Sequence, residues 1–421
     1  MLDGRPCPDR HDGMAVVMTR QTDRGDEHVL IRNHERAFGS TSSMIVAAAH
    51  YDRGMIDGRT ALGGTTNLVF RDGGWVSAEA SLGGTLINCA GGATPWGSWL
   101  TCEETLRNDV STEGKRHGYV FEVAANASQT TGNPIVAMGR FSHEAAAVDP
   151  ASGYVYLTED LHNVSGFYRF IPNDAKGRLG SLEVGGRLQA AKVAGANNTS
   201  LITAERCDEY VLEWIDIANP DRDAGELGAP QLRGFNANPR ASGPFVQAWS
   251  AGALQFARGE GLWYSAGKMY IVDTATGVDG ANRPGRGKGA VWELDLATMK
   301  LKAIFVSEDQ LVGNNPDNIT VSPRGGILVC EDGGRSVDAF GSGTRLLGIN
   351  AQGDSFIFCK NHVDLTAAQI SRVDKRIAPG DYRDSEFAGA CWEPSGHVLF
   401  CNIQSPGITF AIWGPWGDAG V

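Results

Sequence analysis

A short stretch of the chain, residues 88–105, combines a thiol with two adjacent carboxylates. It reads NCAGGATPWGSWLTCEET, with Cys89 before a glycine turn and Glu103-Glu104 where a short aromatic strand is expected to end. Thiolates and carboxylates are both anionic metal ligands, so the stretch predicts a metal site at a strand end. A turn, a core cysteine and a solvated glutamate pair would have the same sequence. Recurrence of the arrangement elsewhere in the chain favours the metal site.

Polar groups stand at the expected ends of many other strands. Crowded like charges disfavour ionisation, so this many carboxylates at one place would need several cations as counter-charge. Oxygen ligands favour calcium or another hard ion, whereas a thiolate suits iron. For any single pair the alternative is a turn cap, since Asp and Asn side chains often bond to their own turns. The groups are Glu35, Cys89, Glu103-Glu104, His143-Glu144, Glu159-Asp160, Glu260, Asp273, Asp317-Asn318 and Glu331-Asp332.

One arginine is placed to act on an anion bound near these acids. Arg258 lies two residues before Glu260, so both side chains would face the same side of an extended strand. A guanidinium beside several cations can hold a phosphate with two hydrogen bonds. The alternative is a simple surface ion pair between the two residues. GxSxG, HExxH and Walker motifs are absent from the sequence.

The chain repeats one phrase: a turn, a glycine, a short apolar strand and a polar end. The copies are DPASGYVYLTED, SPRGGILVCEDG, EPSGHVLFCNIQ and, more loosely, EGLWYSAGKMYIVDT. Such repeats along a long all-β chain without βαβ alternation predict a β-propeller. Its innermost strands would run along a central channel, and their polar ends would meet at one mouth. Among the shorter segments, Ile135–Met138 is predicted to be a strand, and helices are predicted at Thr203–Ile217 and Val363–Ile377.

The composition excludes several classes of function. The chain has 421 residues, 42% of them hydrophobic, and a net charge of −12, which disfavours nucleic-acid binding. No apolar run approaches the roughly 20 residues of a membrane helix, and no signal peptide is visible at the start. The eight cysteines are scattered singly, so a zinc ribbon is not expected.

With these motifs in place, the chain resembles the PhoX-type alkaline phosphatases, a family of calcium- and iron-dependent six-bladed propellers. The strongest match is CAGGATPWGSWLTCEE. Shorter ones follow in family order from Asp12 to Trp416: DGMAVV, RNHE, FSHEAAAVDP, VYLTED, FYRFIP, ARGEG, DNITVSPRGG, CEDG and NIQSPGITFAIWGPW. Three features depart from the family. Gly259 stands where a proline is expected, the chain is shorter, and the twin-arginine leader is not seen. Because the chain starts at its first strand, the closing strand pairing is expected to be incomplete or differently made.

The resemblance implies a single six-bladed propeller domain over residues 1–421, with helical and loop insertions at roughly 173–245 and 360–385. It implies ferric and calcium ions at the channel mouth, a phosphate contact from Arg258, and a catalytic place in the same pocket for Asn33. It also implies a periplasmic or secreted protein, and we expect a monomer. The implied metal ligands are Glu35, Cys89, Glu104, Glu144, Glu260 and Asp317.

The function expected from these features is alkaline hydrolysis of small phosphate monoesters. Hydrolysis of phosphodiesters or phosphotriesters in a similar site is a second interpretation. A third, from another class, is a calcium-stabilised propeller that binds partners without turnover. A lactonase-like propeller is a fourth, although it would not call for the cysteine.

Overall fold

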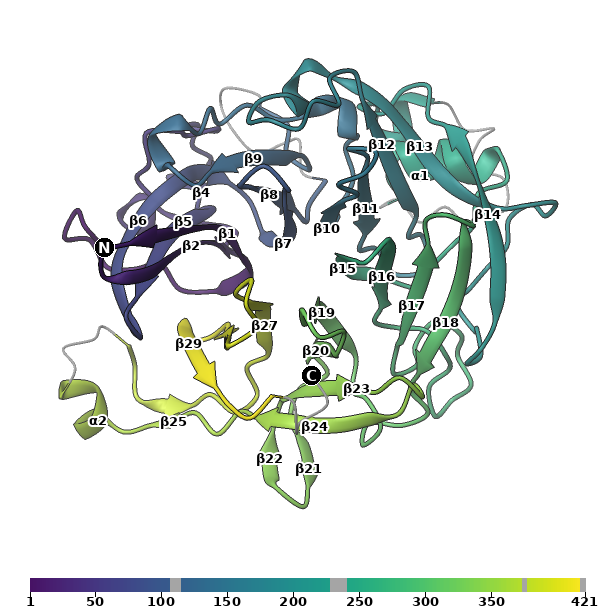
Figure 1. Ribbon diagram of the computed structural model, residues 1–421. Coiled ribbons are helices and arrows are strands. Elements are labelled where there is room, and N and C mark those ends of the chain that lie inside the picture. Colours follow the sequence, from purple (N-terminus) through teal and green to yellow (C-terminus); the bar gives the residue numbers. More distant parts are fainter. Residues whose placement is uncertain (107–114, 228–240, 373–376, 417–421) are drawn as a thin grey trace.

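Residues 1–106, 115–227, 241–372 and 377–416 are described by the computed structural model, and they are almost entirely β-structure (Figure 1). Every strand pairs antiparallel with its neighbours. The sheet at the N-terminus has the order β1 (His11–Thr22), β2 (Gly25–His34), β5 (Gly63–Arg71), β6 (Gly74–Thr85). A three-stranded sheet follows: β7 (Asn88–Ala93), β8 (Ser98–Glu103), β9 (Val120–Ala124).

The middle of the chain forms one nine-stranded sheet. Its order is β10 (His143–Val148), β11 (Val155–Glu159), β12 (Phe167–Pro172), β13 (Gly186–Val193), β14 (Glu209–Asp216), β18 (Lys300–Val306), β17 (Ala290–Asp295), β16 (Lys268–Asp273), β15 (Gly259–Ser265). β14 joins two four-stranded halves, because it pairs with β13 on one side and with β18 on the other. A large core of buried apolar residues lies between these halves and includes Phe256 and Trp292.

Two more sheets complete the ring, and small ribbons and helices decorate it. The sheets are β19 (Pro316–Val321), β20 (Ile327–Glu331), β23 (Arg345–Ile349), β24 (Ser355–Lys360), and β27 (Phe387–Trp392), β28 (Val398–Ile403), β29 (Ile408–Trp413). The ribbons pair β3 (Phe38–Ser40) with β4 (Arg59–Ala61), β21 (Ser336–Asp338) with β22 (Gly341–Gly343), and β25 (Asp364–Leu365) with β26 (Gly380–Asp381); the helices are α1 (Gly243–Ser250) and α2 (Ala367–Ser371).

The sheets stand around a central axis in a propeller-like arrangement (Figure 1). β1, β7, β10, β15, β19 and β27 lie innermost, and each contacts the next around a closed ring. The ring is tight because small residues face the neighbouring strand. A Cβ on Gly13 would come within 2.6 Å of the Ala90 Cα, and one on Gly261 within 2.5 Å of the Asp317 carbonyl oxygen. These strands therefore pack backbone against backbone around the axis.

Each innermost strand starts with the same register. Its first residue pairs with the last residue of the adjacent strand, which we call the second strand of that sheet. A register shift follows within one or two residue pairs. A bulge of this kind bends the strand and re-aims the side chains beside it. The first pairs are His11–His34, Asn88–Glu103, His143–Glu159, Gly259–Asp273, Pro316–Glu331 and Phe387–Ile403.

The first and last sheets meet through individual hydrogen bonds. The His11 amide donates to the Gln404 carbonyl at 3.1 Å, and Asn402 Nδ2 donates to the Asp12 carbonyl at 2.7 Å. Among the described residues, each of the two sheets is built from its own end of the chain, and β1 packs against β27.

Two expectations about local structure need correction, and a third is confirmed in part. The helix predicted at Thr203–Ile217 is wrong: the segment is loop followed by β14, whose aromatic and β-branched residues favour a strand. The strand predicted at Ile135–Met138 is a 3-10 turn over Val136–Met138. α2 lies inside the second predicted helix, Val363–Ile377, of which residues 373–376 fall outside the described residues.

The first predicted insertion, 173–245, is also not wholly an insertion, because β13 and β14 within it belong to the nine-stranded sheet. Within the described residues, no helix has the length and apolar character needed to cross a membrane.

Candidate metal centre

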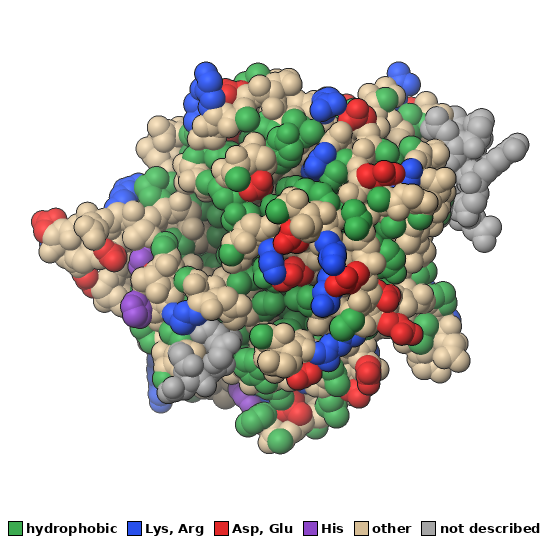
Figure 2. Space-filling view, turned by 45° about the vertical axis from the view of Figure 1, so that its right-hand side comes forward, with side chains coloured by type: hydrophobic (Ala, Val, Ile, Leu, Met, Phe, Trp, Pro, Cys, Tyr) green, Lys and Arg blue, Asp and Glu red, His purple; other side chains and the backbone are tan. Residues whose placement is uncertain are grey.

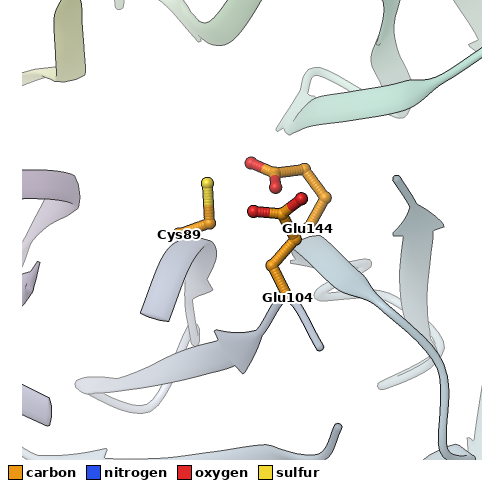
Figure 3. A group of neighbouring side chains, drawn as sticks. All are labelled: Cys89, Glu104 and Glu144. Atoms are coloured by element: carbon orange, nitrogen blue, oxygen red, sulfur yellow. The ribbon is translucent and has the colours of Figure 1, made fainter. Parts of the chain in front are cut away.

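Nine side chains from distant parts of the chain meet at the axis, and we call them the axial cluster. They form four overlapping groups, and in each group one ligand atom per residue lies within 4.8 Å of the others. Figure 3 shows the group that contains the thiol, with all three side chains turned toward one another. The groups are Cys89–Glu104–Glu144, Glu144–Glu260–Asp317, Asp317–Asp332–Glu386 and Asp12–Glu35–Glu386.

The repeated strand geometry explains why these residues meet. Eight of the nine members are either the second residue of an innermost strand or the residue just after the strand that pairs with it. The first position holds Asp12, Cys89, Glu144, Glu260 and Asp317, with Ala388 at the sixth strand. The second position holds Glu35, Glu104, Asp160, Thr274, Asp332 and Gln404.

In each acidic pair the first carboxylate anchors the loop that leads to or follows its strand. Glu103 accepts hydrogen bonds from the amides of Leu86 and Gly118 at 2.9 and 2.8 Å. It also contacts His117, whose other nitrogen lies 3.2 Å from Asp52. Burial alone would lower the pKa of His117, but these two carboxylates raise it to about 9. Glu103 is therefore held inside the sheet and is not available to the cluster.

Two further anchors behave in the same way. Glu159 accepts from the Tyr168 hydroxyl at 2.6 Å and from the Ser242 hydroxyl at 2.5 Å. Glu331 accepts from the Asn314 amide at 2.7 Å and is paired with the buried Arg345. Since neighbouring residues of an extended strand point to opposite sides, the second acid of each pair faces the axis.

Glu144 provides the clearest test of whether the cluster fits a cation. Its side chain is fully buried, and neither carboxylate oxygen has a hydrogen-bond partner among the described residues. Burial, and then the charges of Glu260 and Asp317, raise the pKa of Glu144 well above its ordinary value. A buried carboxylate without a partner is costly unless an ion neutralises it, so the donor set fits a bound metal.

Cys89 is the single sulfur donor of the cluster. Burial, followed by the charges of Asp12 and Glu144, raises the pKa of its thiol. A cation bound between these groups would reverse that effect, because metal coordination deprotonates a thiol. The thiol and the orphan carboxylate of Glu144 therefore favour the same occupant.

The far end of the cluster has oxygen donors only. Gln404 Nε2 lies 2.9 Å from Glu35 Oε2 and 3.2 Å from Asp12 Oδ2, and it also contacts Glu386. Burial, and then the charge of Glu35, raises the pKa of Asp12 to about 7. The amide thus occupies the position between three carboxylates where a hard cation would find oxygen ligands.

Arg258 sits at the other side of the cluster. Its Nε donates to Asp160 Oδ1 at 2.7 Å, and its Nη2 contacts both Asp160 and Glu260, the latter at 3.0 Å. Burial alone would lower the pKa of Arg258, but Glu260 and Asp160 raise it. The guanidinium is fixed on one edge, and 35% of the side chain stays exposed.

Asn33 lies behind Cys89 and not in the cluster. Its amide nitrogen donates to the carbonyls of Cys89 and Ala90 at 2.9 and 2.7 Å. Its oxygen accepts from Trp99 Nε1 and the Thr101 hydroxyl. A fully buried amide with all its bonds in use has nothing left for a substrate. The catalytic role predicted for Asn33 is thus replaced by a positioning role for the Cys89 main chain.

Comparison with known protein families shows the family to which the chain belongs. The sequence signature described as alkaline phosphatase PhoX matches residues 77–407, most of the chain. The chain belongs to the alkaline phosphatase PhoX family. It is therefore a metal-dependent phosphatase that hydrolyses phosphoric monoesters.

One solved structure shares the fold of this PhoX-family chain, and two others resemble it less. Pseudomonas fluorescens PhoX in complex with vanadate, a transition state analogue, superposes with a TM-score of 0.64 at 18% identity, covering 94% of this chain and 84% of the other. A Xanthomonas campestris gluconolactonase reaches a TM-score of 0.37 at 12% identity, covering 98% and 99%. A Staphylococcus aureus virginiamycin B lyase with quinupristin reaches 0.37 at 10%, covering 96% of each chain. No curated protein sequence matches the chain.

All six predicted ligands of this PhoX-family protein lie in the axial cluster, whereas three further members were not chosen as ligands from the sequence. These are Asp12, Asp332 and Glu386. From the sequence, Asp332 is predicted only as half of an acidic pair. The sequence does contain a pattern that could have found Asp12. At the start of five innermost strands, an Asp, Glu or Cys is followed by a small or short residue, giving the dipeptides DG, CA, EA, EG and DN. Glu386 stands one residue before its strand, so that pattern does not find it.

Proposed function

We propose that this PhoX-family phosphatase carries iron at Cys89, Glu104 and Glu144 and calcium at the oxygen-only groups of the axial cluster. The main support is the carboxylate of Glu144, which is buried without a hydrogen-bond partner among the described residues and lies beside the one thiol of the cluster. Sulfur suits iron, whereas carboxylates and an amide oxygen suit calcium. Asp12, Glu35, Glu386 and a rotated Gln404 amide would supply oxygen ligands at the far end.

Bound cations would neutralise the phosphate oxygens and stabilise the charge that develops as the ester bond breaks. The chain's own contribution is to hold the phosphate in place. Asp160 and Glu260 fix one edge of the Arg258 guanidinium. The opposite edge, which includes Nη1, can then bind a phosphate oxygen without first losing conformational freedom.

We also propose that the sheets form six blades. The support is the ring of six innermost strands, each with the same first pair and the same bulge. On this interpretation the nine-stranded sheet is two blades joined at their outer edges by β14. The repeated geometry is what brings acids from every part of the chain to one axis.

The test of the activity is phosphate release from p-nitrophenyl phosphate by protein prepared with iron and calcium, at alkaline pH. The proposal expects this monoester to be hydrolysed faster than bis(p-nitrophenyl) phosphate and a p-nitrophenyl phosphotriester. A preference for the diester or triester would favour the second sequence interpretation. Loss of all turnover in protein that holds calcium but no transition metal is expected, and full activity in that state would contradict the iron assignment.

A further inference from the structure

A second arginine lies at the edge of the axial cluster and lines an open pocket. Arg10 directly precedes β1, and its carbonyl accepts a hydrogen bond from the Glu35 amide at 2.9 Å. This bond sets the two side chains beside each other: Arg10 Nη2 contacts Glu35 Oε2, and Arg10 Nε donates to the Glu35 carbonyl at 3.3 Å. Arg10 thus stands at the Glu35 end of the cluster, as Arg258 does at the Glu260 end.

The pocket beside Arg10 has the size of a small-molecule site. Its volume is about 360 Å³, within the range of ligand pockets in proteins. Ala37, Leu62 and Ile87 form an apolar wall. Ile87 lies two residues before Cys89, and its carbonyl accepts from the Glu104 amide at 2.9 Å. The pocket therefore adjoins the Glu35 end of the cluster, and the main chain of its Ile87 is bonded to that of Glu104 at the thiol end.

The charges around the pocket leave one group free to bind a ligand. Arg36, the other arginine of the pocket, is held by Asp9 at 2.9 Å and by the Ser43 carbonyl at 2.7 Å. Arg10 is held only through Glu35, and its Nη1 makes no hydrogen bond to a described residue. With 42% of the side chain exposed, Arg10 can offer this nitrogen to a bound molecule.

We propose that this pocket holds the leaving group of the substrate and that Arg10 selects leaving groups bearing a carboxylate. The inference rests on the proposed phosphatase site, because a phosphoryl group bound at the cluster would direct its ester substituent into the adjoining pocket. The apolar wall suits a hydrocarbon or aromatic body. A single negative charge suits the free edge of one guanidinium, since the other charges of the pocket are already paired.

The test compares two substrates that differ only in charge, 4-carboxyphenyl phosphate and its amide, 4-carbamoylphenyl phosphate. The readout is the ratio of their kcat/KM values in metal-loaded protein. Comparing this ratio between variants cancels the intrinsic reactivity of the two esters. Arg10→Gln is expected to lower the ratio about tenfold, the size of one charge-assisted hydrogen bond.

Two further variants serve as controls for this comparison. Ala37→Glu adds a negative charge to the exposed rim, leaves the Arg10–Glu35 pair intact and is expected to lower the ratio at least as much. Arg24→Gln removes one positive charge from the exposed turn at the opposite end of β1 and should leave the ratio within about twofold. An unchanged ratio in both Arg10→Gln and Ala37→Glu would overturn the proposal.

Failure of the phosphatase site itself gives a different result. If neither ester is turned over, calorimetry with 4-carboxybenzylphosphonate and 4-carbamoylbenzylphosphonate measures the same preference without chemistry. The carboxylate is expected to bind the metal-loaded wild type about tenfold more tightly, and Arg10→Gln should abolish the difference. Equal affinities in the wild type would contradict the inference about Arg10.

Discussion

Glu144 is the residue of the axial cluster that most needs a cation, because both of its carboxylate oxygens are buried and lack a hydrogen-bond partner among the described residues. In metal-free protein its pKa is raised well above 4.5 by burial and by neighbouring acids. The folded state then binds protons more tightly than the unfolded state. The resulting stability is present below pH 4.5 and is lost as the pH rises toward the folded pKa.

Glu144→Gln should therefore stabilise metal-free protein at pH 8, by about 1–3 kcal/mol in the free energy of unfolding, because a neutral amide avoids the cost of protonating or ionising a buried carboxyl group. The same change should lower the stability of metal-loaded protein, which loses a ligand. Urea unfolding with and without a chelator measures both effects. Glu159→Gln is the matched control: Glu159 is equally buried but accepts three hydrogen bonds, so its replacement should destabilise both forms.

At the scale of strands, the neighbouring acids Glu103 and Glu104 should differ sharply in effect. Glu103→Gln removes an acceptor of buried amides and is expected to reduce stability by about 2–4 kcal/mol while the metal content of folded protein stays unchanged. Glu104→Gln should lower the metal content with a smaller effect on metal-free stability. Thermal unfolding and elemental analysis of the two variants separate the roles. Equal metal loss in both would contradict the division between anchor and ligand.

The sequence could locate these acidic pairs but could not say which member faces the axis. Alternation along a strand predicts that Glu103 and Glu104 point to opposite sides. Which of the two side chains faces the axis depends on the bulge near Asn88 and on backbone amides such as that of Gly118. These features lie outside the acidic pair itself. Asn33 shows the same limit, since RNHE matches a family motif while its amide is used by the Cys89 main chain.

At the scale of the whole molecule, the axis is closed by direct contact between innermost strands. A Cβ at Gly92 of β7 would overlap the Ala146 carbonyl of β10. Gly92→Ala should therefore lower the free energy of unfolding by about 2–4 kcal/mol, because neither backbone can yield without disturbing the ring. Gly74→Ala is the control, since the nearest atom to its Cβ is 3.9 Å away. Thermal unfolding of both variants tests this prediction. Equal melting temperatures would contradict the close packing of β7 against β10.

The whole-molecule arrangement was predictable in outline from four repeated phrases, which indicate strands of one kind along an all-β chain. The meeting of Asp12 with Gln404 was not, because the two residues are brought together only when the ring closes. The segment that became β14 was misassigned because its role is set by pairing with β18, some ninety residues later.

The central claim is that one cysteine and a set of scattered carboxylates bind a shared group of cations. Elemental analysis of purified wild type, Cys89→Ser and Cys102→Ser tests it most directly. Cys102 is also buried in the same sheet but packs in an apolar core. Wild type and Cys102→Ser should contain both iron and calcium, whereas Cys89→Ser should lose iron and keep most of its calcium. Iron content that is absent from the wild type, or equal in all three proteins, would contradict the account.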